Sequence, residues 1–301
     1  MIKFIVKRIL TIVPVLLGVT FLVYLLMTIA PGNPEVAPLR KVTDPEEKEQ
    51  LKEELGLNDP ILVRYVRMMK GMFVDESGAV SDIIFKMKVF LPNSLKLCFT
   101  ALAISVVLAL PLGIIAAVKQ NTLFDGACMV VSLVGVSMPN FWLALILMIV
   151  FALNLGWFPT SGSTEPIHIV LPAATLAFIN MASIARVTRS SMLEVIRQDY
   201  IRTAQAKGVP YNRVIKKHAL KNALIPTITV VGVQLGELLS STIIIENIFA
   251  WPGIGRQLMQ AIEQTSVRTS RTHNRRSYRH VILKCDILIL LAKYLFSNDS
   301  L

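Results

Sequence analysis

The segment DYIRTAQAKGVPYNRVIKKHALKNALIP, residues 199–226, governs the interpretation of the whole chain. It is strongly basic and lies between two long apolar runs. A Lys or Arg at the centre of a membrane-spanning helix costs about 2.5–3.5 kcal/mol, so this segment is expected to stay outside the hydrocarbon. An excess of Lys and Arg in such a loop places it on the cytoplasmic side. The cations in and just before the segment are Arg186, Arg189, Arg197, Arg202, Lys207, Arg213, Lys216, Lys217 and Lys221, against the acids Glu194 and Asp199.

The basic segment carries the signals of two helices joined by a turn. Ser191 and Glu194 have the spacing of a capping box, which predicts a helix start there. Gly208 suits a left-handed helix C-cap, and Pro210 suits the first turn of a following helix. Apolar residues at helical spacing predict an apolar face resting on the inner membrane surface, although a solvated basic loop explains the pattern equally well. The residues of that face are Ile196, Tyr200, Thr203, Ala204, Val214, Ile215, Ala219 and Leu220.

The composition indicates a membrane protein. The 301 residues are 53% hydrophobic and carry a net charge of +11, with a mean hydropathy of +0.59. Several apolar runs have the length of about 20 residues that crosses a bilayer. The cations lie in loops between these runs, which is a pattern of membrane topology and not of nucleic-acid binding. We expect an all-α polytopic protein with five clear transmembrane helices, a doubtful sixth, a cytoplasmic helix-turn-helix and no nucleic-acid partner.

Two of the expected spans contain residues that interrupt an apolar helix. The five apolar runs occupy residues 9–29, 94–118, 127–153, 167–187 and 225–245. Pro139 lies in the third run, where its missing backbone hydrogen bond must kink or break the helix. Gln234 and Glu237 lie in the fifth run, and an ionisable group inside a span is a candidate functional residue. Packing alone can account for the kink, and Glu237 can instead pair with a neighbouring subunit.

Residues 31–92 form the expected outer loop, which contains a helix of its own. Asp44 followed by Pro45 and two glutamates predicts a helix start, and Gly56 predicts its end. The loop is either a generic charged surface or a platform for an external protein.

The chain resembles a known family at the basic segment. Arg202-Thr203-Ala204, then Gly208, then the run HALKNALIP at 218–226 look like the coupling loop of permease subunits of binding-protein-dependent ABC transporters. The sequence of these motifs is similar to that of the dipeptide/oligopeptide/nickel branch. The general motif has Glu-Ala-Ala and Asp-Gly where this chain has Arg202-Thr203-Ala204 and Lys207-Gly208, a departure that fits the branch. Further similarity lies in PGNP at 31–34, LGLNDP at 55–60 and WPGIG at 251–255.

The resemblance implies the permease subunit of an ATP-driven importer for small peptides. It implies a multi-pass location in a bacterial or archaeal cytoplasmic (inner) membrane. The implied partners are a second homologous permease, two ATP-binding subunits at the cytoplasmic loop, an outer substrate-binding protein and membrane lipid. Pro139, Gln234 and Glu237 become candidates for the translocation path. The resemblance assigns ATPase coupling to Arg202, Thr203, Ala204, Lys207, Gly208, His218, Ala219, Leu220 and Asn222.

Other functions remain as alternatives. Nickel or another small solute fits the same branch. A stand-alone channel or a membrane enzyme would need converging ionisable residues inside the spans, and only Glu237 is found. The sequence contains no P-loop, no Gly-x-Ser-x-Gly and no His-Glu-x-x-His, and its four histidines are scattered. We therefore expect no catalytic residue, no cofactor and no metal site, and the three cysteines have no disulfide or metal-binding spacing.

The end of the chain departs from this pattern. We expect residues 1–93 to form the first span and outer loop, residues 94–264 to form the permease core with its coupling loop at 190–224, and residues 265–301 to be a frameshifted tail. The apolar run at 281–296 is only about 24 Å long as a helix, against a hydrocarbon core of about 30 Å. A frameshifted chain would be a non-functional truncated permease, and the alternative is a divergent sixth helix. The arginines that would fall on the outer side, against the positive-inside rule, are Arg268, Arg271, Arg275, Arg276 and Arg279.

Overall fold

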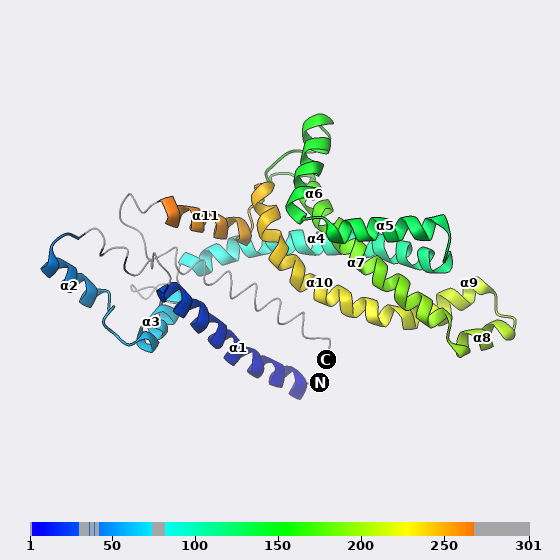
Figure 1. The fold of residues 1–301 in the computed structure, drawn as a ribbon, viewed down its shortest axis with the longest axis horizontal. Coiled ribbons are helices and arrows are strands. Elements are labelled where there is room, and N and C mark those ends of the chain that lie inside the picture. Colours follow the sequence, from blue (N-terminus) through cyan, green and yellow to red (C-terminus); the bar gives the residue numbers. More distant parts are fainter. Residues whose placement is uncertain (1, 30–35, 37–38, 40–41, 74–81, 268–301) are drawn as a thin grey trace. The chain divides into compact units, whose positions relative to one another are not determined.

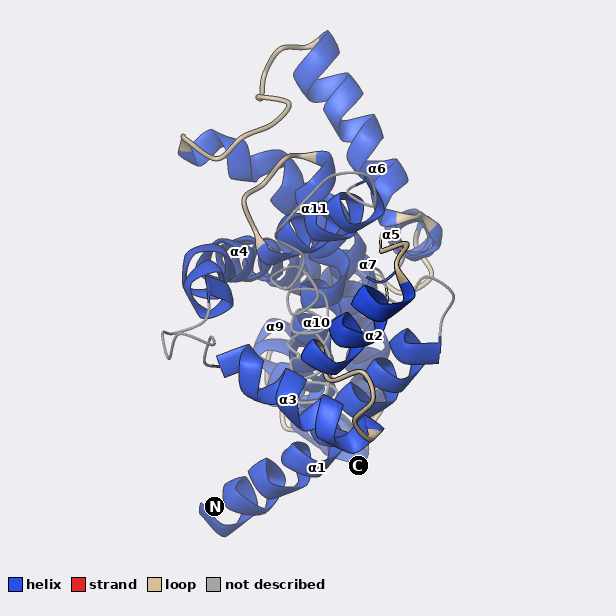
Figure 2. Ribbon diagram, turned by 90° about the vertical axis from the view of Figure 1, so that its left-hand side faces the viewer, coloured by secondary structure: helices blue, strands red, loops and turns tan. Residues whose placement is uncertain are grey.

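The described part of the chain consists of helices joined by turns and loops. The computed structural model describes residues 2–29, 36, 39, 42–73 and 82–267. Every regular element within those ranges is a helix, as Figure 2 shows, which confirms the predicted all-α class. The tail prediction lies almost entirely outside the described residues. The elements (Figure 1) are α1 Ile2–Ile29, α2 Pro45–Glu54, α3 Ile61–Phe73, α4 Asp82–Val118, α5 Leu123–Ser137, α6 Asn140–Leu147, η2 Met148–Asn154, η3 Pro166–Ile169, α7 Val170–Ile196, α8 Asp199–Ala206, α9 Tyr211–Arg213, η4 Val214–Ala219, α10 Leu220–Ile248 and α11 Ile254–Val267.

The chain divides into two compact units. The first contains Met1–Leu91 together with the described residues from Gln257 onward, and the second contains Pro92–Arg256. In the first unit Tyr65 joins α3 to α1. The Tyr65 hydroxyl lies 2.5 Å from Thr20 Oγ1, and the Tyr65 and Phe21 rings are nearly perpendicular, with a centroid distance of 5.3 Å.

The helix predicted in the outer loop is present as α2. The Asp44 side chain caps it by accepting a hydrogen bond from the Glu46 amide at 3.2 Å. Gly56 follows the helix with φ +59°, a left-handed conformation that favours glycine. The predicted start and end are both confirmed.

Three helical stretches are long and apolar enough to cross a membrane: 85–118 in α4, 166–196 from η3 through α7, and 211–248 from α9 through α10. A fourth span is made if α5 and the α6–η2 helix, which meet at a bend of 107°, count as one. Helix α1 carries a shorter apolar stretch, Val13–Leu26. The described residues thus provide three or four candidate spans by length and composition, and the doubtful sixth lies outside them.

The predicted break at Pro139 is confirmed. Helix α5 ends at Ser137, and Pro139 has extended backbone angles of φ −64° and ψ 134° at the start of α6. Because Pro139 has no N–H, the hydrogen-bond ladder of α5 does not continue through it. Helix α5 starts at Leu123, earlier than residue 127, where the third apolar run begins. The Thr122 side chain caps the helix by accepting a hydrogen bond from the Asp125 amide.

Two predicted helix boundaries are wrong. No helix starts at Ser191, because α7 runs without interruption to Ile196 and Ser191 is buried inside it. A capping box needs a residue whose backbone lies outside the helix, and Ser191 has no such backbone. The second span begins before Ser94, since α4 extends back to Asp82 through Pro92. Hydrophobicity marks the membrane part of a helix, not its full length.

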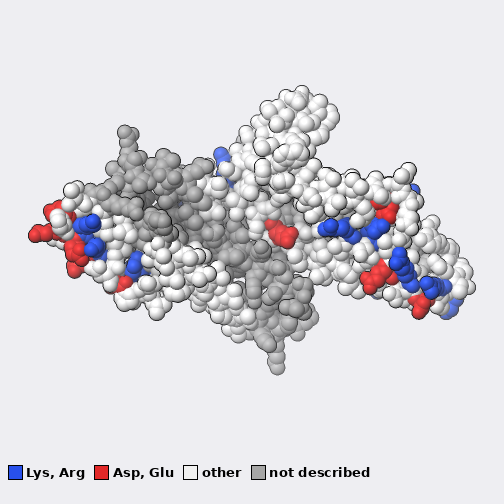
Figure 3. Space-filling view, in the orientation of Figure 1, with Lys and Arg blue, Asp and Glu red and all other residues white. Residues whose placement is uncertain are grey.

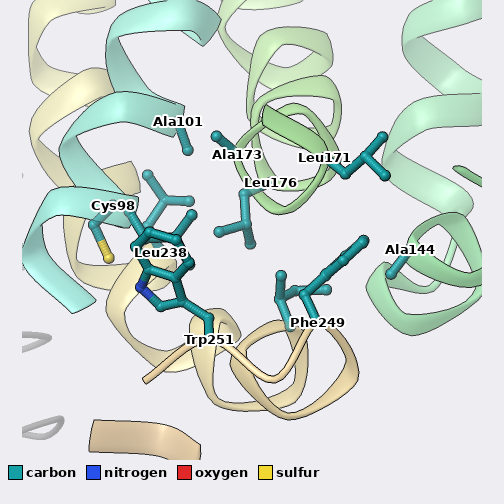
Figure 4. Packing of buried hydrophobic residues seen from close by; sticks show 11 residues of the cluster. Cys98, Ala101, Ala144, Leu171, Ala173, Leu176, Leu238, Phe249 and Trp251 are labelled. Carbon is teal, nitrogen blue, oxygen red and sulfur yellow. The ribbon is translucent and has the colours of Figure 1, made fainter. Parts of the chain in front are cut away.

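The main core of the second unit joins the amino-terminal half of α4 to α6, α7 and α10. Figure 4 shows Cys98 and Ala101 facing Leu176 and Leu238, with Phe249 and Trp251 closing one side. The small residues in this cluster let the helix backbones approach closely, as is typical of helix packing in membranes.

Candidate functional site

The basic segment folds as a helix, a turn and a second helix. Helix α8 ends at Ala206, and Gly208 follows with φ +78°, which confirms the predicted left-handed turn. Pro210 caps the next helix, immediately before its first residue, Tyr211. That helix is not a separate element, because α9, η4 and α10 form one continuous helix from Tyr211 to Ile248.

The apolar side of the segment is buried against the protein's own helices. Val214, Ile215 and Ala219, three residues of the predicted apolar face, are buried in a cluster that also contains Met192 of α7 and Ala117 of α4. The prediction that this face rests on the inner membrane surface is therefore wrong.

The predicted register of α8 also needs correction. Tyr200 and Thr203 are exposed, whereas Ile201 is fully buried in the cluster. Tyr200 and Thr203, which belong to the predicted apolar face, therefore face solvent. The burial of Ile201 in the cluster with Val214 and Met192 determines the rotation of the helix. Which face of a helix this short points inward depends on its tertiary partners.

The opposite side of the segment is cationic and open. Figure 3 shows Lys and Arg gathered at the end of the second unit where α7, α8 and α9 lie. The Asn222 amide donates a hydrogen bond of 2.8 Å to the Tyr200 hydroxyl and so links the two helices. Of the expected coupling residues, Ala219 is buried; Ala204, His218 and Leu220 are half-buried; and the exposed ones are Arg202, Thr203, Lys207, Gly208 and Asn222.

The three candidates for a path through the spans do not form one group. Gln234 is half-buried on α10 and donates a hydrogen bond of 3.3 Å to Ser183 of α7. Glu237 lies one turn further along α10 and is exposed. Its carboxylate makes no hydrogen bond or ion pair with another described residue. Pro139 lies at the break between α5 and α6, and no hydrogen bond joins it to either residue.

A second polar centre, which the sequence analysis missed, surrounds Glu246. This residue of α10 is fully buried. Its carboxylate accepts hydrogen bonds from Ser94 Oγ at 2.5 Å and from the Arg256 amide at 3.2 Å. Glu246 therefore caps the amino terminus of α11 and ties it to the start of the apolar part of α4.

The segment Trp251–Gly255 is shaped around this carboxylate. A Cβ atom on Gly253 would lie 2.2 Å from the Glu246 carboxyl carbon, and one on Gly255 would lie 2.4 Å from the Ile243 backbone. The Trp251 ring N–H donates a hydrogen bond of 3.1 Å to the Asn93 carbonyl. A signal for this centre was present in the sequence, since Gly253 and Gly255 come within seven residues of the end of a helix whose last turn contains an acid. Its partner Ser94, 152 residues away, could not be deduced.

An ion pair joins α5 to α7 near their ends. Arg189 Nε and Nη2 donate to the two carboxylate oxygens of Asp125 at 2.5 and 2.7 Å. Asp125 also accepts the Asn121 amide at 3.1 Å, in the short turn between α4 and α5. The sequence analysis counted Arg189 among the loop cations; the structure instead places it in a bidentate pair. Within the described ranges, no three His, Cys, Asp or Glu side chains are arranged to hold a metal ion.

Comparison with known proteins identifies the family. The family described as binding-protein-dependent transport system inner membrane component matches residues 109–271, and its amino-terminal family matches residues 1–84. The dipeptide transport system permease protein DppB of Alkalihalophilus pseudofirmus is 40% identical over 87% of this chain and 88% of its own length. The oligopeptide transport system permease protein AppB of Bacillus subtilis is 37% identical over 88% of both chains.

A solved structure agrees at the level of the fold. The crystal structure of an amino acid ABC transporter with histidines superposes with a TM-score of 0.52 at 16% identity, and it covers 73% of this chain and 97% of that one. The two family matches and the two relatives together extend over most of the sequence. The chain therefore belongs to the family of inner-membrane components of binding-protein-dependent transport systems.

Proposed function

We propose that this chain is the permease subunit of an ATP-driven importer of small peptides. Two relatives that are 37% and 40% identical over most of the chain are named as oligopeptide and dipeptide permeases, which supports both the role and the substrate class. In this proposal the chain forms part of the translocation path and catalyses no reaction. A second homologous permease completes the path, two ATP-binding subunits drive it, and an outer binding protein delivers the peptide.

The proposed topology has five spans and a cytoplasmic amino terminus. The spans are α1, α4, the bent pair of α5 with α6–η2, α7 and α10. Residues 1–93 then comprise the first span and outer loop, and residues 94–264 comprise the core. The basic segment lies on the cytoplasmic side of the inner membrane, where its excess of cations is favoured.

The observation that carries the coupling role is the exposed glycine turn on a segment anchored to a span. Gly208 is exposed, and the space around its missing side chain is open: a Cβ there would meet no atom within 4 Å. A partner surface therefore has free access to the backbone of the turn. Arg202, Thr203 and Lys207, which are also exposed, surround this contact in the proposal, and Ala204, His218, Ala219, Leu220 and Asn222 hold its shape.

The continuous helix provides the link from the turn to the path. Since α9, η4 and α10 form one helix of 38 residues, it is about 57 Å long at 1.5 Å per residue. A displacement at Tyr211 is therefore passed along one helix, through the π-helical turn of η4 and past Pro226, to Gln234 and Glu237. These two residues, with the bend at Pro139, are the proposed lining of the path.

The test is peptide uptake by the reconstituted complex with Gly208→Val. Valine at φ +78° is strained, and a left-handed conformation costs a non-glycine residue about 1–2 kcal/mol. We expect the variant to assemble with its partners and to lose ATP-driven uptake. The matched control is Gly126→Val, because Gly126 also has open space around it but has an ordinary φ in helix α5.

Two results would contradict this proposal. Wild-type uptake by the Gly208→Val complex would remove the coupling role. Uptake of labelled nickel and not of labelled dipeptide by the wild-type complex would leave the permease role intact and replace the substrate class.

A further inference from the structure

An apolar cavity of about 180 Å³ lies between α4, α5 and α7 in the second unit. Its wall includes Leu112 and Ala116 of α4, Phe124 and Val131 of α5, and Met181 of α7. From Phe124 to Val131 the wall follows two turns of α5, a depth of about 10 Å along the helix. The cavity therefore runs from the end of the helices into their apolar part.

The size and lining of the cavity suit part of a hydrocarbon chain. Pockets for whole small-molecule ligands hold about 300–1,000 Å³, which is larger than this cavity. The surface beside it on α5 is also apolar, since Leu123 is 95% exposed and Val130 is 61% exposed. Such a surface faces lipid when the helix lies in a membrane.

The mouth of the cavity is positively charged. Arg186 and Arg189 both line it, and Lys119 Nζ lies 6.0 Å from the centre of the Phe124 ring. Asp125 neutralises Arg189 through the bidentate pair. Arg186 is exposed and forms no ion pair within the described part of the chain. Two cations, Arg186 and Lys119, are thus available to a ligand at this end.

We propose that this cavity is a binding site for an anionic phospholipid. One acyl chain enters the apolar cavity, and the phosphate of the headgroup binds Arg186, with Lys119 as a second cation beside it. A basic pocket between spans at the cytoplasmic side is the arrangement that binds acidic headgroups. The charge of the mouth selects an anionic lipid over a zwitterionic one, and the cavity selects a lipid over free phosphate. The lipid also fills the gap between α5 and α7 beside their ion pair.

The test is lipid retention by the full chain, purified in detergent with its assembled partners and measured by native mass spectrometry. The probes are phosphatidylglycerol and phosphatidylcholine with identical acyl chains. We expect the wild-type protein to retain one phosphatidylglycerol in preference to phosphatidylcholine. Arg186→Gln is expected to lower that preference about fivefold, the contribution of one cation near an anionic membrane surface. Lys216→Gln removes the same charge from the exposed basic segment and is expected to leave the preference unchanged.

A second variant tests the apolar part separately. Ala127 is exposed and lines the cavity, so Ala127→Trp fills it without changing any charge. We expect this variant to lose the first bound lipid of either headgroup. Equal retention of the two lipids by the wild type, an unchanged preference in Arg186→Gln, or full retention in Ala127→Trp would each overturn the proposal.

Discussion

Replacing Glu246 by alanine removes an acceptor that two donors share. The Ser94 hydroxyl can turn to another acceptor, but the amide of Arg256 is fixed at the amino terminus of α11. Each buried donor left without a partner costs about 1–3 kcal/mol. The Arg256 amide therefore predicts a loss of about 1–3 kcal/mol in the free energy that keeps this region closed.

The chain contains its own reporter for this loss. Cys98 is fully buried in the cluster that contains Trp251, which is directly joined to the Glu246 centre. Its thiol can react with a maleimide only when the cluster opens, so the labelling rate follows the open population. In a background with Cys128→Ser and Cys285→Ser, Glu246→Ala is expected to label at least about five times faster than the wild type, since each 1.4 kcal/mol is tenfold.

The matched control is Glu237→Ala. It removes the same side chain from the same helix, but Glu237 is exposed and makes no hydrogen bond or ion pair with another described residue through its carboxylate. Its Cys98 labelling is expected to stay at the wild-type rate. The reasoning would be refuted if Glu246→Ala labelled no faster than the wild type, or if both variants accelerated labelling equally.

Three further predictions concern the ion pair, the orientation and the tail. Arg189→Leu leaves the buried Asp125 carboxylate without its cation, which is expected to cost about 3 kcal/mol of stability and to lower the thermal midpoint of unfolding in detergent. The double variant with Asp125→Asn should recover part of the lost stability, and no recovery would contradict the pairing. In intact cells, a single cysteine introduced as Lys216→Cys is expected to be protected from an impermeant maleimide, while one introduced as Ser161→Cys is expected to react. Labelling of Lys216→Cys would contradict the proposed topology. A reading-frame shift after codon 264 predicts that another frame of the nucleotide sequence encodes an Asp-Tyr/Phe-Pro turn and about 20 apolar residues; if no frame does, the shift is disproved.

The sequence alone was sufficient for features that depend on local chemistry. Apolar runs separated by basic loops predicted the helical membrane class, because a helix satisfies its backbone within itself and the membrane requires about 20 apolar residues. Gly208, Gly56 and Pro139 act through their own backbone conformations. A left-handed turn and a missing N–H need no distant partner, and all three interruptions occur where they were predicted.

Features that depend on distant residues were decided only by the tertiary structure. Ser191 continues α7, although its local spacing favours a helix start. Ile201, not Tyr200, faces inward because Val214 and Met192 complete its pocket. The sequence analysis did not single out Glu246, and it counted Arg189 among the loop cations. Each has its role because a partner, Ser94 or Asp125, comes from a helix far away in the sequence. Burial and pairing are properties of packed helices, so no local pattern in the sequence specifies them.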